Sequence, residues 1–110
     1  MESKWGYQLT KKADADLDNI VEYIAVELAN PEAASHFMDK LQRVIEETRS
    51  FPESGSLVNN EFVPDTEVRK KLIDNYIMYY LPDFDEKLIY ILRIVYGRQN
   101  IDEIIRQLNV

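Results

Sequence analysis

The feature of this sequence that most limits its fold is a series of three strand-like segments in its last third. They cover residues 68–73, 76–81 and 88–96, and all three are rich in Ile, Leu, Val or Tyr. Only Asp74 and Asn75 separate the first segment from the second, and residues 82–86 lie between the second and the third. Connections this short join antiparallel neighbours. The segments therefore predict a three-stranded antiparallel meander.

Two amphipathic helices are predicted before this meander. The first begins after Thr10 and extends to Leu28, and the second begins at Asn30-Pro31 and ends before Phe51-Pro52. Asn is a favourable N-cap, and Pro is tolerated at the first helical position. Apolar residues recur at helical spacing in both segments, at Ala13, Leu17, Ile20, Val21, Ile24 and Leu28 and at Ala34, Phe37, Met38, Leu41, Val44 and Ile45. Because a meander needs one face covered, the helix hairpin is expected to cover it.

The remaining segments complete a single domain over residues 1–110. Residues 5–10 alternate apolar and polar side chains, which predicts an N-terminal strand, and residues 53–67 have no clear period, which indicates a surface loop. Asn100 and Glu103 resemble a capping box for a short C-terminal helix. The expected fold class is therefore α+β: a two-layer domain with an N-terminal strand, a helix hairpin, a three-stranded antiparallel meander and a short C-terminal helix.

Charge and composition exclude several classes of function. The net charge is −7, with −8 in residues 1–67 and +1 in residues 68–110, which disfavours tight unassisted binding to nucleic acid. We interpret the acidic residues of the first helix as a solvated face and not as a metal site. Without cysteine there is no disulfide, thiolate nucleophile or Cys-based zinc site. No apolar run suits a signal peptide or membrane span, so a cytoplasmic protein without a membrane partner is expected.

Cationic and phenolic side chains of the meander are the candidates for chemistry. Arg69 and Lys71 share one face of the first strand because side chains alternate along a strand. Arg93 stands in an aliphatic row, where it is either a rim residue or an anion-binding group. The tyrosines of the meander serve as packing, as stacking platforms or as proton donors. Common enzyme signatures are absent from the sequence, so any catalysis would use Arg, Lys, Tyr and carboxylates.

The order of these segments, and the residues within them, resemble a known family. The matching fragments are Tyr7-x-Leu9-Thr10 leading into Ala13-x-x-x-Leu17-x-x-Ile20, Tyr23-Ile24, Asn30-Pro31-x-Ala33-Ala34-x-x-Phe37, Phe51-Pro52-x-x-Gly55, Arg69, Tyr76-Ile77-x-Tyr79-Tyr80 and Arg93-Ile94-Val95-Tyr96-Gly97-Arg98-x-Asn100. In this order they resemble the RelE/ParE superfamily of toxins from bacterial type II toxin-antitoxin systems. The ending Arg93 to Arg98 is closer to the ParE-like branch.

This resemblance implies a plasmid-stabilisation type of toxin that inhibits growth and is neutralised by a cognate antitoxin. A ParE-like toxin acts by binding a protein target such as DNA gyrase. The target-binding residues that the resemblance implies are Arg69, Lys71, Tyr79, Arg93 and Arg98. It implies no cofactor and no metal, and it leaves open a homodimer or a heterotetramer with the antitoxin.

The resemblance also leaves two other functions open. One is a RelE-like, metal-independent endonuclease that cuts mRNA on the ribosome, in which Arg69 and Lys71 clamp the phosphate, Arg93 stabilises negative charge and Tyr96 donates a proton. Against this, Ile77 and Ile105 stand where cleaving relatives tend to have Arg and Tyr. The other is a non-toxic relative that serves only as a binding partner.

Overall fold

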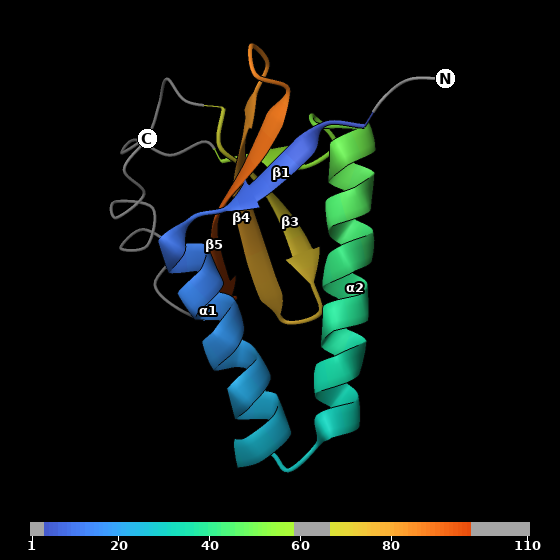
Figure 1. Cartoon of the computed structure of the whole chain (residues 1–110), viewed down its shortest axis with the longest axis vertical. Coiled ribbons are helices and arrows are strands. Elements are labelled where there is room, and N and C mark those ends of the chain that lie inside the picture. The colour runs from blue at the N-terminus through green and yellow to red at the C-terminus, as the bar shows by residue number, and fades with distance from the viewer. Residues whose placement is uncertain (1–3, 59–66, 98–110) are drawn as a thin grey trace.

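Two helices lie against one face of a five-stranded sheet (Figure 1). The computed structural model describes residues 4–58 and 67–97. The strand order is β1-β5-β4-β3-β2. In chain order the elements are β1 (Gly6–Leu9), α1 (Lys11–Glu22), the π-helix η1 (Tyr23–Glu27), α2 (Pro31–Ser50), β2 (Ser56–Leu57), β3 (Arg69–Ile73), β4 (Tyr76–Asp83) and β5 (Leu88–Tyr96). The predicted α+β fold with its helix hairpin and antiparallel meander is confirmed. The predicted C-terminal helix lies outside the described residues.

The helices begin where the capping residues predict. Thr10 Oγ1 accepts a hydrogen bond from Ala13 N at 3.2 Å, and Asn30 Oδ1 accepts one from Ala33 N at 3.1 Å. The first helix differs from the prediction at its end, because α1 stops at Glu22 and continues as η1. Leu28 N donates to Tyr23 O, five residues back, which is the hydrogen bond of a π-helix. This π-helical turn contains one more residue than an α-helical turn, and the chain reverses direction after it, before α2 begins.

The sheet contains two pairings that the sequence pattern did not predict. β1 pairs in parallel with β5, from Gly6 opposite Leu88 to Leu9 opposite Ile91. β2, in the segment interpreted as a loop, pairs antiparallel with β3. Two residues are too few to show a strand period, so sequence alone gives no signal for β2. The predicted meander of β3, β4 and β5 pairs antiparallel throughout.

A β-bulge shifts the side-chain alternation of β5. Tyr79 lies opposite Arg93 whereas Tyr80 lies opposite Ile91, so Leu92 has no partner of its own in β4. Ile91 and Ile94 consequently belong to the same buried cluster although they are three residues apart. The predicted aliphatic row of Ile89, Ile91, Arg93 and Val95 on one face of β5 is therefore wrong. Ile89 and Ile91 face the helices, whereas Val95, after the bulge, lies on the other face. Arg93 lies at the edge of β5, beyond the end of β1.

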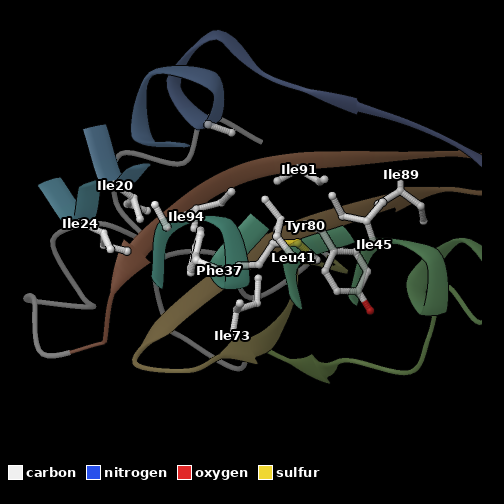
Figure 2. Packing of buried hydrophobic residues seen from close by; sticks show 13 residues of the cluster. Ile20, Ile24, Phe37, Leu41, Ile45, Ile73, Tyr80, Ile89, Ile91 and Ile94 are labelled. Atoms are coloured by element: carbon white, nitrogen blue, oxygen red, sulfur yellow. The ribbon is translucent and has the colours of Figure 1, made fainter. Parts of the chain in front are cut away.

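The main core fills the space between the helices and the sheet (Figure 2). Ile20 and Ile24 of the first helical segment lie beside Ile94, and Phe37 of α2 contacts the ring of Tyr76 edge-on at 5.2 Å. A second cluster lies on the other face of the sheet and consists of Val58, Val68, Ile77, Tyr79 and Val95. β4 and β5 are thus buried on both faces, which explains their near-continuous apolar sequence.

The hydroxyl group of Tyr80 fixes the loop after α2. It donates to Pro52 O at 2.9 Å and accepts from Gly55 N at 2.8 Å. We expect Tyr80→Phe to lower the free energy of unfolding by about 2 kcal/mol, because the buried Gly55 N–H and the partly buried Pro52 carbonyl both lose their partner. Urea denaturation measures this change. Tyr7→Phe, at an exposed ring, is the control and should change stability by less than about 0.5 kcal/mol; equal stability of the two variants would refute the role of the hydroxyl.

Two buried tyrosines should make the fold sensitive to alkaline pH. Burial raises the pKa of Tyr79 and Tyr80 above the ordinary phenol value. Because the tyrosine pKa is higher in the folded state than in the unfolded state, the full stability is present below the unfolded pKa of about 10. Stability is then lost as the pH rises further, since the unfolded chain releases these protons more readily. We expect the urea midpoint to fall as the pH rises above about 10, and to fall less in Tyr79→Phe. An equally steep fall in that variant would contradict the assignment.

Candidate functional site

A cavity of about 750 Å³ lies between η1, the start of α2 and the end of β5. Its lining contains apolar, aromatic and polar side chains. The lining residues that matter for its chemistry are Asp16, Ile20, Tyr23, Leu28, Phe37, Tyr76, Arg93, Ile94 and Tyr96. Apolar concave sites with a few convergent polar groups are the usual form of a binding site.

An ion pair between α1 and β5 lines this cavity. Arg93 Nε donates to Asp16 Oδ2 at 2.7 Å, and Arg93 Nη2 donates to Asp16 Oδ1 at 3.1 Å. Both side chains are mostly buried, with 17% and 16% of their surface exposed. The hydrogen bond to Asp16 raises the pKa of Arg93, whereas burial acts in the opposite direction. The guanidinium is thus held in one orientation by a two-point contact.

The second half of β5 has hydrogen bonds to the side chain of Thr10, the N-cap of α1, and to the side chain of Asp16 within α1. β1 ends opposite Ile91, whose carbonyl accepts from Thr10 N at 3.0 Å. The next two bonds come from side chains: Thr10 Oγ1 donates to Leu92 O, and Asp16 Oδ2 accepts from Ile94 N, both at 3.0 Å. Asp16 therefore satisfies both a guanidinium and a backbone N–H.

Three tyrosines surround the cavity. The rings of Tyr76 and Tyr96 meet edge-on with centroids 5.7 Å apart. Burial is the main cause that raises the pKa of Tyr76, with smaller contributions from Tyr23 and Tyr96. Tyr23 and Tyr96 are 50% and 39% exposed, and both line the cavity.

The other predicted cations are bound to groups elsewhere. Arg69 Nη1 donates to the carbonyls of Gly55 at 2.7 Å and Glu53 at 3.0 Å, and Lys71 Nζ pairs with Glu47 of α2 at 2.5 Å. Arg69, Lys71 and Arg93 therefore each have a different acidic or carbonyl partner. In the described part of the chain they do not converge on one point.

The predicted aromatic residues are also divided between the two faces of the sheet. Tyr96 borders the cavity, whereas Tyr79 is fully buried on the face away from the helices. Arg98 lies outside the described residues. Of the predicted site residues, the structure thus brings Arg93 and Tyr96 to the cavity and places Arg69, Lys71 and Tyr79 elsewhere. Their roles in target binding or catalysis remain predictions.

Asp16 is the site residue that sequence reasoning missed. The sequence pattern assigns it to a solvated face together with Asp14 and Asp18, which are exposed in the structure, whereas Asp16 is partly buried. Its spacing carries a different signal, because it lies three residues after Ala13 and four before Ile20, both buried. An acid at these spacings is on the apolar side of its helix and needs a partner there.

Within residues 4–58 and 67–97, no group of three or more His, Cys, Asp or Glu side chains is arranged to hold a metal ion. None of the helices described by the structure is long and apolar enough to cross a membrane.

Solved structures share this fold. The chain superposes on the chromosomal ParDE toxin-antitoxin system from P. aeruginosa with a TM-score of 0.65 and 26% identity, covering 84% of this chain and 96% of that one. It superposes on a RelBE toxin-antitoxin complex from Mycobacterium tuberculosis with a TM-score of 0.58 and 16% identity, covering 86% and 99%. For an archaeal RelE-RelB complex from Pyrococcus horikoshii the TM-score is 0.53, the identity 14% and the coverage 89% and 100%. The fold is that of RelE/ParE toxins.

The amino-acid sequence matches one family within this fold. The family described as the ParE toxin of the type II toxin-antitoxin system parDE matches residues 7–101. No curated protein matches the chain. The chain therefore belongs to the ParE toxin family of type II toxin-antitoxin systems.

Proposed function

We propose that the chain inhibits bacterial growth by binding a protein target, DNA gyrase, and that a cognate antitoxin neutralises it. Membership of the ParE toxin family and the likeness to a ParDE system support this function. Arg93 and Tyr96, which border the same cavity, are the proposed contact residues.

The pairing of the cationic side chains with groups of the chain itself favours a binding function over catalysis. Arg69, Lys71 and Arg93 are each occupied by a carbonyl or carboxylate of the chain itself. A phosphate clamp needs several cations that point to one anion and are not already neutralised. Carboxylates near each cation also weaken the attraction for RNA at physiological salt.

Purified gyrase tests this proposal. We expect the chain at micromolar concentration to inhibit supercoiling and to promote gyrase-dependent DNA cleavage. Arg93→Lys should weaken inhibition, whereas Lys12→Ala, at an exposed residue of α1, should leave it unchanged. Unaffected gyrase activity with wild-type chain would remove gyrase as the target.

One observation favours the ribonuclease alternative. Arg93 and Tyr96, the predicted charge stabiliser and proton donor, both line the cavity. Induction of the chain followed by primer-extension mapping of transcripts tests this function. Codon-phased cuts that disappear in Tyr96→Phe would establish it, and uncut transcripts during growth arrest would eliminate it.

The antitoxin is proposed to be the product of an adjacent small gene. Co-expression of the two reading frames should yield a complex that survives affinity purification and restores growth. Failure of the neighbouring product to co-purify would contradict this part of the proposal.

A further inference from the structure

Exposed apolar side chains gather at the tip of the helix hairpin, where η1 ends and the chain turns toward α2. Val26 is 66% exposed and lies outside the lining of the cavity. Tyr23 and Leu28, in the same helical turn, are 50% and 55% exposed. We call these three residues the hairpin tip. Large apolar side chains exposed together are typical of a surface that contacts another protein.

The net charge of the chain is concentrated in the hairpin around this tip. Residues 13–39 contain seven Asp and Glu residues and no Lys or Arg, so they carry a charge of −7. The rest of the chain contains 13 acidic and 13 basic residues and has no net charge. The hairpin turn lies at the end of the molecule opposite the β4–β5 turn (Figure 1). The hairpin is thus the acidic part of an otherwise neutral chain.

Four exposed carboxylates form a stripe that leads to the hairpin tip: Asp14, Asp18, Glu22 and Glu27. The first three are four residues apart, which places them on one face of α1, one turn from each other. The step from Glu22 to Glu27 is five residues and falls in η1, where the hydrogen bond also spans five residues. Glu27 therefore continues the same face. We call these four residues the acidic stripe.

The acidic stripe is not neutralised by cations of the described chain. The ion pairs within residues 4–58 and 67–97 use other carboxylates, namely Asp16, Glu46, Glu47, Glu53 and Asp74. Like charges four residues apart on a helix repel, so the stripe lowers the stability of the first helical segment. A local pattern that opposes folding is expected where a surface serves a function.

The charge of this surface decides the class of its partner. A second copy of the chain would bring an identical acidic stripe against it, and nucleic acid would be repelled as well. A protein surface that carries Lys and Arg beside apolar groups is complementary to both the stripe and the tip. Such surfaces are typical of proteins that hold DNA, because binding to phosphates depends on Lys and Arg.

We propose that the hairpin tip and the acidic stripe dock on a basic surface with which DNA gyrase holds DNA. The carboxylates of the stripe pair with cations that otherwise bind phosphates, and Val26 and Tyr23 contact apolar groups between those cations. The chain and DNA then compete for this surface. Supercoiling requires contact with more than one DNA segment, so displacement at one surface still allows cleavage at another. The inference rests on the proposed function, because it takes gyrase as the target.

The first test compares two charge-matched variants for binding to purified gyrase. Glu22→Gln/Glu27→Gln removes two carboxylates of the stripe, and Asp85→Asn/Glu86→Gln removes two exposed carboxylates of the β4–β5 turn. We expect the stripe variant to bind gyrase about ten-fold more weakly and the control to bind like wild type. The urea midpoint of the stripe variant should be at least that of wild type, because repulsion is relieved. Equal affinities would overturn the docking surface.

Salt and DNA identify the surface of gyrase that is bound. The affinity of wild type for gyrase should fall as the salt concentration rises from about 50 to about 200 mM, and it should fall less for Glu22→Gln/Glu27→Gln. An excess of linear duplex DNA should displace wild type from gyrase. Binding that is equally tight with and without this DNA would overturn a DNA-holding surface as the partner.

Val26→Ser tests the apolar part of the contact, with Val26→Ile as its control. Because Val26 is exposed, neither variant should change the urea midpoint noticeably. We expect Val26→Ser to bind gyrase about five-fold more weakly, since less apolar surface is removed from water, and Val26→Ile to bind like wild type. Wild-type affinity of Val26→Ser would overturn the role of the tip.

Titration with the product of the adjacent reading frame separates the two partners. Glu22→Gln/Glu27→Gln should keep the wild-type affinity for that product. Loss of this affinity with unchanged gyrase binding would assign the surface to the antitoxin and overturn the inference. If wild type and the stripe variant bind gyrase equally, the docking surface is refuted and the proposed function stands. If wild type does not bind gyrase at all, the proposed function is contradicted as well.

Discussion

Replacing Asp16 with alanine is expected to lower the free energy of unfolding by about 3 kcal/mol. The carboxylate accepts from Arg93 at two points and from Ile94 N, and all three hydrogen bonds disappear together. The substitution also leaves a mostly buried guanidinium without its counter-ion. Removal of one partner from a buried ion pair costs more free energy than the intact pair contributes to stability, because the remaining charge stays buried without a partner or water.

Urea denaturation of wild type, Asp16→Ala and Asp18→Ala measures this effect. Asp18 is exposed on the same helix, so its substitution should change stability by less than about 0.5 kcal/mol. The double variant Asp16→Ala/Arg93→Met should recover part of the loss, since it removes the unpaired charge as well. A double variant less stable than Asp16→Ala would show that the pair does not act as described.

Gly55→Ala should destabilise the fold by about 3 kcal/mol. A Cβ atom at this position would lie 2.6 Å from the Tyr80 hydroxyl and 2.8 Å from the carbonyl oxygen of Lys70. The carbonyl belongs to β3 and cannot move without disturbing its pairing with β2. The substitution would therefore displace Tyr80 from both of its hydrogen bonds.

Gly6→Ala is the matched control for this prediction. A Cβ atom there would meet only Leu88 Cδ1, at 3.2 Å, and that methyl group can rotate away. Thermal unfolding of the two variants should show a clear loss for Gly55→Ala and a change of no more than about 1 kcal/mol for Gly6→Ala. Similar melting temperatures would refute the steric explanation for the glycine after Phe51-Pro52.

The fold was largely predictable from the sequence because its elements carry strong local signals. The helices have a regular apolar spacing and begin at Thr10 and Asn30, which both cap as expected. The meander follows from short connections between strand-like segments. The parallel pairing of β1 with β5 was not predictable. An alternating pattern predicts which residues form a strand, but it does not predict with which other strand they pair.

The site was less predictable because it depends on interactions between distant segments. The bulge at Leu92 is invisible in a pattern of alternating residues, and it decides which way Arg93 points. Arg69 and Lys71 share a strand face as expected, yet their partners come from the loop after α2 and from α2 itself. Whether a cation is available or neutralised is set by such partners, so residue type and spacing alone do not determine it.

The pairing of the first strand with the last has a kinetic consequence. Gly6 lies beside Leu88, so the sheet cannot be completed until segments 82 positions apart in the chain have met. Contacts between such distant segments close a long loop and slow folding relative to local contacts. The meander and the helix hairpin can form early from neighbouring residues. The cavity, which needs both α1 and the end of β5 in place, should be among the last features to form.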